Sequence, residues 1–88
     1  MLLISYDLNR PGQDYQDLIA AIKAYGNWAH VLKSTWLIRT TQTADQVSTD
    51  LRKHMDPNDN LLVIEVNPKN KQGWLSRKFW NWMNGKTA

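Results

Sequence analysis

The 88-residue sequence contains no cysteine, which excludes disulfide bonds and thiolate metal sites and fits a reducing compartment. It also lacks any apolar run approaching the roughly 20 residues that a membrane-spanning helix needs. The opening MLLIS is too short for a signal peptide and is not preceded by basic residues. We therefore expect a soluble, cytoplasmic protein with no membrane partner. The sequence has no glycine-rich phosphate loop, nucleophile motif or zinc signature that would indicate another enzyme class.

The C-terminal stretch of the sequence contains no acidic residue. The net charge is +3, but residues 69–88 hold five basic residues and no acid, whereas the remainder holds six basic and eight acidic residues. Such a basic segment suits a phosphate backbone or another acidic surface, and the plain alternative is ordinary solvation of a terminal helix. The five basic residues are Lys69, Lys71, Arg77, Lys78 and Lys86.

The hydrophobic pattern begins with a strand and a helix. Residues 1–6 are apolar on both faces, which is typical of a central strand. Pro11 and Gly12 predict a turn, after which Asp14 can cap an amphipathic helix over residues 15–25.

Residues 29–40 form either one long strand or two short strands with a kink near Lys33 and Ser34. The pattern leaves both alternatives open, because apolar residues alternate through the whole stretch.

A second helix and strand follow. Thr43 and Gln46 have the spacing of a capping box, ahead of an amphipathic helix. Asp56 and Asp59 flank a proline turn and are expected to be turn formers. LLVIEV, residues 61–66, predicts a buried strand.

The C-terminal stretch returns to helical spacing. Trp74, Leu75, Phe79 and Trp82 share one predicted side, so we expect this helix to pack onto the body. Trp80 lies off that stripe, where it could anchor a protein interface or stack on a base, and we favour the interface.

These elements predict a single α+β domain over residues 1–88. Residues 1–67 would form a ferredoxin-like βαββαβ sandwich, and residues 68–88 a basic, Trp-rich amphipathic helix. Two helices can cover only one face of such a sheet, while its strands look apolar on both faces. We therefore expect a homodimer that buries the uncovered face.

Three stretches carry a family resemblance: ISYDLN at 4–9, VLKSTWLI at 31–38 and DPNDNLLVIEV at 56–66. They resemble the small CRISPR-associated adaptation proteins, which are dimeric ferredoxin-like partners of the CRISPR integrase. Related folds occur in the VapD-type toxin ribonucleases. The resemblance covers about residues 1–67. It implies a homodimeric nucleic-acid-processing protein, here a divergent stand-alone relative.

The resemblance also implies site residues. Asp7 matches the aspartate that closes the family's first strand and is proposed there to hold a divalent metal, so Mg²⁺ or Mn²⁺ is the expected cofactor. Ser34 matches a serine that precedes an apolar strand. Arg10 alone represents the basic residues that commonly follow the first strand. The chain ends in a Trp-rich helix where the family often has a strand exchanged across the dimer, so that helix is a candidate site for a protein partner.

Asp7 has three interpretations from its own chemistry. It could accept hydrogen bonds from the turn that follows, which is a common role for aspartate. Two copies in a dimer could instead hold a hard divalent cation, because one carboxylate alone binds such a cation weakly. In the third interpretation, Asp7 is a vestigial acid in a protein that only binds nucleic acid.

Other candidates concern nucleic-acid binding, for which Arg10, Arg39, Arg77 and Lys78 are the expected phosphate contacts. His30 and His54 share no ligand spacing and are expected to be structural. The leading hypothesis is a metal-dependent endoribonuclease or endodeoxyribonuclease. The alternative is a non-catalytic nucleic-acid-binding or protein-scaffolding relative, and the sequence leaves open whether the protein is an enzyme.

Overall fold

A computed structural model describes residues 1–9 and 15–85 of the chain. Its elements are β1 (Leu2–Asp7), α1 (Gln16–Lys23), β2 (Trp28–Leu32), β3 (Thr35–Ile38), α2 (Ala44–Arg52), β4 (Asn60–Glu65) and α3 (Arg77–Met83). The strands form one sheet in the order β2-β3-β1-β4, and neighbouring strands are antiparallel. This small α+β arrangement is compatible with a ferredoxin-like fold. The prediction that β1 is a central strand is confirmed.

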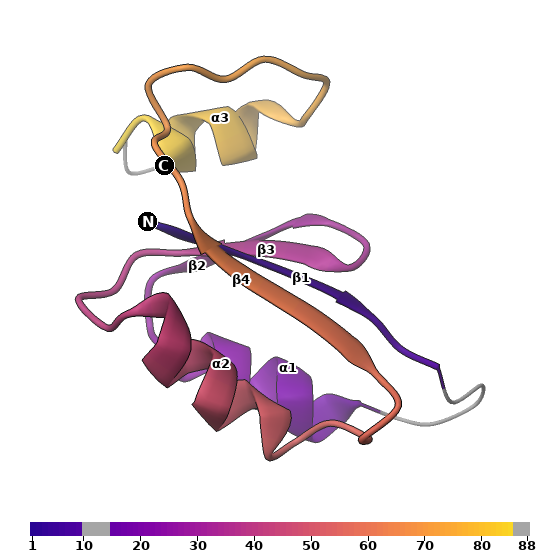
Figure 1. Cartoon of the computed structure of the whole chain (residues 1–88). Coiled ribbons are helices and arrows are strands. Elements are labelled where there is room, and N and C mark those ends of the chain that lie inside the picture. The colour runs from indigo at the N-terminus through magenta and orange to yellow at the C-terminus, as the bar shows by residue number, and fades with distance from the viewer. Residues whose placement is uncertain (10–14, 86–88) are drawn as a thin grey trace.

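Helices α1 and α2 cover one face of the sheet (Figure 1). Strand β1 alternates, so that Leu2 and Ile4 point into this layer, and Trp36 of β3 lies opposite Ile4. Trp36 is only 1% exposed and is among the largest fully buried side chains. We call this cluster the helix-layer core. It consists of Leu2, Ile4, Tyr15, Leu18, Ile22, Trp36, Ile38, Val47 and Leu51.

Helix α2 begins at the predicted capping box. The Thr43 hydroxyl accepts a hydrogen bond from the Gln46 backbone N–H at 3.1 Å, and the Gln46 side chain accepts one from the Thr43 backbone N–H at 2.9 Å. Helix α1 begins differently, because its N-cap residue is Tyr15, which makes no side-chain capping hydrogen bond. The expected cap, Asp14, lies outside the described residues.

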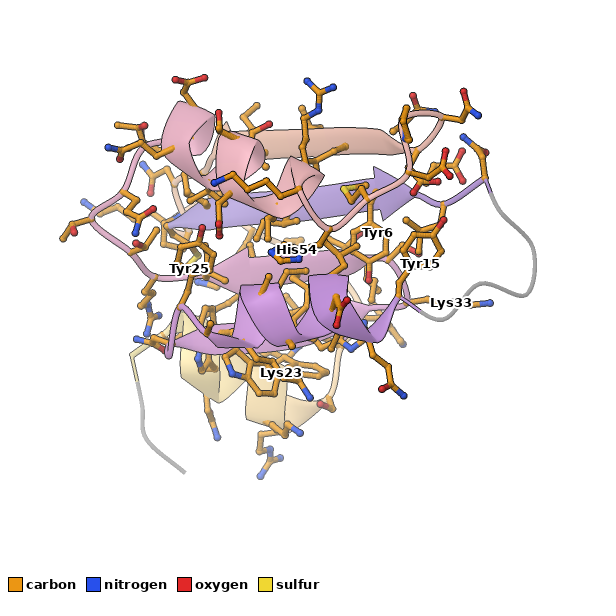
Figure 2. The ribbon with its side chains drawn as sticks, turned by 90° about the horizontal axis from the view of Figure 1, so that it is seen from below. Tyr6, Tyr15, Lys23, Tyr25, Lys33 and His54 are labelled. Atoms are coloured by element: carbon orange, nitrogen blue, oxygen red, sulfur yellow. The ribbon has the colours of Figure 1, made fainter. Side chains whose placement is uncertain are left out.

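The stretch 29–40 contains two strands rather than one. Strands β2 and β3 form a hairpin through a turn at Lys33 and Ser34, and Lys33 extends from one end of the molecule (Figure 2). The register shifts between His30 and Leu32, which marks a bulge or irregularity just before the turn. The predicted kink is thus a complete reversal of the chain.

The sheet's second face is partly covered by α3, which lies across it from the other two helices (Figure 1). Residues Ala29 and Leu37 pair across β2 and β3 and are buried, as is Met83 of α3. Helix α3 contacts β2. We call this contact region the α3 face. Helix α3 therefore contacts the body through a side that includes Met83.

Two expectations about burial are wrong. Strand β4 lies at the edge of the sheet, and its Leu62 and Ile64 are 54% and 47% exposed. The segment is apolar on both faces, but a helix layer covers only the face that holds Leu61 and Val63. Trp74 is 98% exposed, because α3 begins only at Arg77, and the helical spacing that aligned Trp74 with Trp82 does not extend to it.

Candidate functional site

Asp7 is the last residue of the central strand β1 and is exposed. It is paired in register with Asn60 at the start of β4, so the two side chains are cross-strand neighbours. Alternation along β1 places Asp7 on the face away from α1 and α2, together with Ser5. A shallow hollow of about 260 Å³ runs past this point and is lined by Ser5, Tyr6, Asp7, Asn60, Leu61 and Leu62.

Ser34 lies at the same end of the sheet as Asp7. Its carbonyl oxygen accepts a hydrogen bond from the backbone N–H of Tyr6, the residue before Asp7, at 3.1 Å. Thr35, the next residue, exchanges a hydroxyl hydrogen bond with Ser5 at 3.2 Å. The β2–β3 turn therefore supports the exit of β1, and the fold brings the two residues from the family resemblance close together.

Asp59 organises the loops that adjoin this site. One carboxylate oxygen accepts hydrogen bonds from the Asn9 backbone N–H at 2.8 Å and from the Tyr15 hydroxyl at 3.1 Å. The other oxygen accepts the backbone N–H of Asp56 at 2.8 Å. Asp56 in turn accepts the backbone N–H of Asn58 at 3.0 Å. The expectation that Asp56 and Asp59 are turn formers is confirmed.

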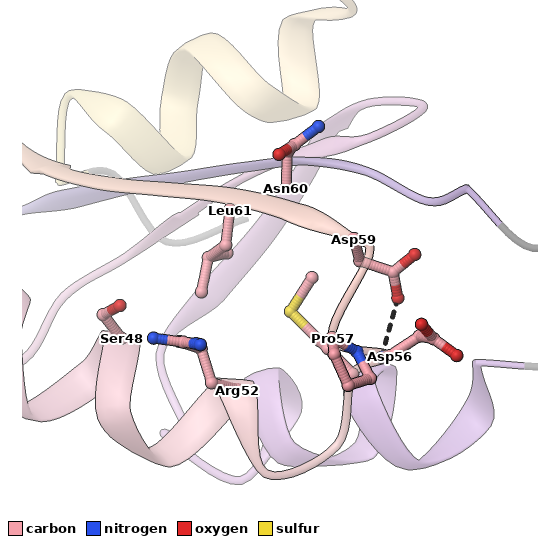
Figure 3. A pocket seen from close by; sticks show the side chains of 8 residues that line it. Ser48, Arg52, Asp56, Pro57, Asp59, Asn60 and Leu61 are labelled. Atoms are coloured by element: carbon pink, nitrogen blue, oxygen red, sulfur yellow. Dashed lines mark hydrogen bonds between the residues drawn. The ribbon is translucent and has the colours of Figure 1, made fainter.

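A pocket of about 370 Å³ opens between α2 and the start of β4 (Figure 3). Arg52 and Ser48 border it from α2, and the hydrogen-bonded pair Asp56 and Asp59 borders it from the turn. Because the pocket carries charges of both signs and Asp59 is already bonded to loop donors, its geometry favours no particular ligand.

The expected divalent metal finds few ligands within one chain. Among residues 1–9 and 15–85, no three His, Cys, Asp or Glu side chains lie together as a metal-binding group. Asp7 and Asn60 together offer one carboxylate and one amide oxygen, and hard cations take six or more oxygen ligands. A metal at Asp7 therefore depends on a second chain or on water, and Mg²⁺ or Mn²⁺ stays a prediction.

Arg39, an expected phosphate contact, is bonded to α3. Its Nη2 group donates hydrogen bonds to the carbonyl oxygens of Trp82 at 2.6 Å and Met83 at 3.0 Å. Its guanidinium also lies 4.5 Å from the centre of the Trp82 ring, and the Trp82 Nε1–H donates to the Asn27 side-chain oxygen at 3.0 Å. The guanidinium thus satisfies carbonyls at the end of the helix, where a cation is favoured.

The remaining expected phosphate contacts are on the C-terminal segment. Arg77 and Lys78 are exposed in the first turn of α3, and Lys69 is exposed in the preceding loop. The Lys71 ammonium donates to the Pro68 carbonyl oxygen at 2.7 Å, which leaves further donors on the same group. Arg10 lies outside the described residues.

Trp74 is a feature that sequence reasoning placed wrongly. The other four tryptophans make contacts within the chain: Trp28 and Trp36 pack together, Trp80 donates to the Leu75 carbonyl oxygen, and Trp82 lies under Arg39. In the part of the chain that the structure describes, Trp74 makes no hydrogen bond or ring contact and is 98% exposed. The one available signal was Ser76, which precedes α3 as its N-cap residue and places Trp74 outside the helix.

The two histidines differ in their surroundings, and only His30 is shown packed against other side chains in the described residues. The His30 ring stacks on Trp36 at 3.9 Å with 7° between the planes, and its Nε2–H donates to the Lys33 carbonyl oxygen at 3.0 Å. The Trp36 Nε1–H donates to the Tyr6 hydroxyl at 3.1 Å. His54 is exposed just after α2 (Figure 2). His30 therefore links the β2–β3 turn to Trp36 of the helix-layer core.

Tyr25 has a clear electrostatic change. Its hydroxyl donates to the Asp50 carboxylate at 2.9 Å and so joins the end of α1 to α2. Burial first, and then the hydrogen bond and negative charge of Asp50, raise the pKa of Tyr25 from 10.0 to about 12. The phenol therefore stays protonated at neutral pH and acts as a tie between the helices.

Comparisons with family models, curated proteins and solved structures found no match to this chain. No helix in the described residues is long and apolar enough to span a membrane. The functional argument therefore depends on the surfaces of the molecule itself.

Proposed function

We propose that this chain is a homodimeric nucleic-acid-binding protein with a ferredoxin-like fold. One observation carries the proposal: residues 66–85 hold Lys69, Lys71, Arg77 and Lys78 without any acidic residue, and three of these cations are exposed. An acid-free basic surface attracts phosphates and releases counterions when it binds them. The resemblance to CRISPR-associated adaptation proteins and VapD-type toxins points to the same class of partner.

The exposed part of the sheet supports the proposal that the protein is a dimer. Leu62 and Ile64 lie on edge strand β4, on the face away from α1 and α2, and about half of each side chain is exposed. An edge strand with an apolar face is a surface that proteins normally cover or pair. A two-fold dimer would pack this strip against its own copy.

A nuclease is the second candidate function, and the position of Asp7 favours it. Asp7 lies on the same sheet face as Leu62, so a dimer that buries this strip would bring the two Asp7 carboxylates toward each other. Two carboxylates could hold the divalent cation that one cannot, and such a cation would supply water activation and charge stabilisation at a phosphodiester. A protein partner on the C-terminal segment is the remaining alternative.

Nucleic-acid binding is tested by fluorescence anisotropy with labelled single-stranded and double-stranded DNA and RNA. Affinity should fall steeply as salt rises from about 50 to 200 mM, because each phosphate contact releases counterions. The double variant Arg77→Gln, Lys78→Gln should bind more weakly. Its matched control is Arg52→Gln, Lys53→Gln, which removes two exposed charges at the end of α2 and should bind normally. Wild-type protein that binds no nucleic acid at low salt would refute the proposal.

The dimer is tested by sedimentation. Leu62→Lys with Ile64→Lys should yield a folded monomer, because burying two ammonium groups in an apolar interface is costly. The control is Leu32→Lys, since Leu32 is 56% exposed on β2 at the opposite edge of the sheet and should not affect assembly. A wild-type monomer at micromolar concentration would contradict the dimer.

The nuclease candidate is tested with and without Mg²⁺ or Mn²⁺ on wild type and Asp7→Asn. This substitution keeps the side chain's size but removes the charge that a hard cation requires. It should abolish metal-dependent cleavage and leave the dimer folded. Cleavage that persists in the variant, or a wild type without cleavage, would leave nucleic-acid binding as the function.

A further inference from the structure

Trp74 is the most exposed large apolar side chain of the described residues, and nothing in the fold uses it. The side chain of a tryptophan typically buries about 150–250 Å² when it packs, so leaving one in water forgoes a large stabilisation. The segment around it, residues 71–76, has no helix or strand and carries the chain back to the start of α3 (Figure 1). The exposed ring is therefore best explained by something outside the chain.

The surroundings of Trp74 are cationic. Lys71 precedes it by three residues, and Arg77 and Lys78 follow it by three and four. Arg77 and Lys78 are exposed, and the Lys78 ammonium lies 5.3 Å from the centre of the Phe79 ring. The nearest preceding acid in the sequence is Glu65, so Trp74 has cationic sequence neighbours on both sides and no acidic one within residues 66–88.

The chemistry of this segment distinguishes between three kinds of partner. A protein interface surrounds its anchor with other apolar groups, and a membrane surface needs an apolar face in addition to charge. Within residues 66–85, Trp74 is the only large apolar side chain that the structure leaves exposed. One free ring flanked by cations matches single-stranded nucleic acid, whose bases offer a stacking surface and whose phosphates offer negative charge. In a duplex the base faces are already stacked on each other.

We propose that Trp74 is a stacking platform for a base of a single-stranded nucleic acid, with Arg77 and Lys78 binding the adjoining phosphates. This inference rests on the proposed nucleic-acid binding and specifies its substrate as a single strand. Recognition by stacking tolerates any base, because every base has a π-face. The platform would therefore bind strands with little sequence preference.

The experiment compares two labelled probes of equal length, a dT oligonucleotide and an abasic strand with the same phosphodiester backbone. Wild-type protein should bind the dT probe about 5- to 150-fold more tightly, which corresponds to stacking of one base at about 1–3 kcal/mol. Trp74→Ala should bind both probes equally, and Trp74→Phe should restore part of the preference. Because the ring is exposed, thermal melting should show that both variants fold as the wild type does.

The charge variant gives an independent readout. Arg77→Gln with Lys78→Gln should weaken binding to both probes by the same factor and keep the preference for dT. It should also lower the salt slope by about 0.7 for each phosphate contact that is lost. Leu32→Ala is the matched control for loss of an exposed apolar side chain, since Leu32 is 56% exposed on β2, and it should leave the dT preference unchanged.

The remaining outcomes overturn the inference in separable ways. If wild-type protein binds dT and abasic strands equally, Trp74 does not stack, although the proposed nucleic-acid binding survives. If wild-type protein binds a duplex more tightly than the dT strand, the single-strand inference also fails, although the proposed nucleic-acid binding survives. If Trp74→Ala loses binding only to vesicles of mixed neutral and anionic phospholipid, the ring is a membrane contact. If no nucleic acid binds at all, the proposed function fails together with the inference.

Discussion

The two faces of the sheet are closed by different physical means. On one face, α1 and α2 bury the helix-layer core, a contiguous cluster of nine largely apolar side chains. On the other, α3 contacts β2, and Ala29, Leu37 and Met83 are buried; Arg39 donates hydrogen bonds to the Trp82 and Met83 carbonyl oxygens, and Trp82 donates one to the Asn27 side chain. The first face depends on apolar area, which many substitutions can preserve. The second depends on a few donors and acceptors, so a single substitution can open it.

The largest expected effect comes from the same substitution at two tryptophans. Trp36→Ala should lower the free energy of unfolding by about 3–5 kcal/mol, because it leaves a cavity in the helix-layer core. Trp74→Ala should change it by less than about 0.5 kcal/mol, since the side chain is exposed. Urea denaturation followed by far-UV circular dichroism measures both. Equal losses would show that Trp74 packs within the folded chain.

Arg39→Ala tests whether polar bonds hold α3. We expect a loss of about 1.5–3 kcal/mol, because the guanidinium donates two charge-assisted hydrogen bonds to the end of the helix. Trypsin should then cleave sooner after Arg77 and Lys78, while the helix-layer core stays protected from hydrogen exchange. Arg39→Lys keeps the positive charge but lacks the planar guanidinium, so its loss of stability should be smaller than that of Arg39→Ala.

The control for that test is Arg52→Ala, which removes an exposed arginine from α2. It should not alter the tryptic pattern of α3. If Arg39→Ala leaves cleavage unchanged, apolar burial alone holds α3 and the two faces do not differ as described.

The smallest expected effect concerns pH and the hydrogen bond between Tyr25 and Asp50. The folded pKa of Tyr25, about 12, lies above its ordinary value of 10.0, so the folded state holds the phenolic proton more tightly. This stabilisation is complete below pH 10.0 and is lost as pH rises through about 12. Since the site is partly open to solvent, we expect a loss of about 1 kcal/mol or less. Tyr25→Phe should flatten the stability curve in this window, and an unchanged slope would contradict the assignment.

Local sequence signals predicted the structural features that depend on interactions between residues close in sequence. The capping box at Thr43 and Gln46 forms with both reciprocal bonds. The apolar character of both faces of β1 correctly indicated a central strand. The start of α3 could not be predicted from the apolar stripe, because the helical spacing continues back to Trp74 although the helix begins only after Ser76, whose side chain makes no capping hydrogen bond.

The candidate site was only partly predictable for a similar reason. Asp7 was located from its place at the end of an apolar strand, and its exposure follows from β1 ending there. The bonds that Asp59 makes to Asn9 and Tyr15 join residues 44 to 50 positions apart, and no local pattern encodes them. Arg39 looked like a phosphate contact because its sequence neighbours do not reveal that a helix end will cover it.

The position of β1 in the sheet has a consequence for how the protein is made. Strand β1 precedes both of its partners in the chain, and its Leu2 pairs with Ile38 of β3 on one side and Glu65 of β4 on the other. Pairings between distant positions form late, because the intervening chain must close first. During translation, the hairpin and α2 can assemble before β4 is synthesised, and until then one edge of β1 remains unpaired. That bare apolar edge is the natural point for a chaperone to bind and for nascent chains to aggregate.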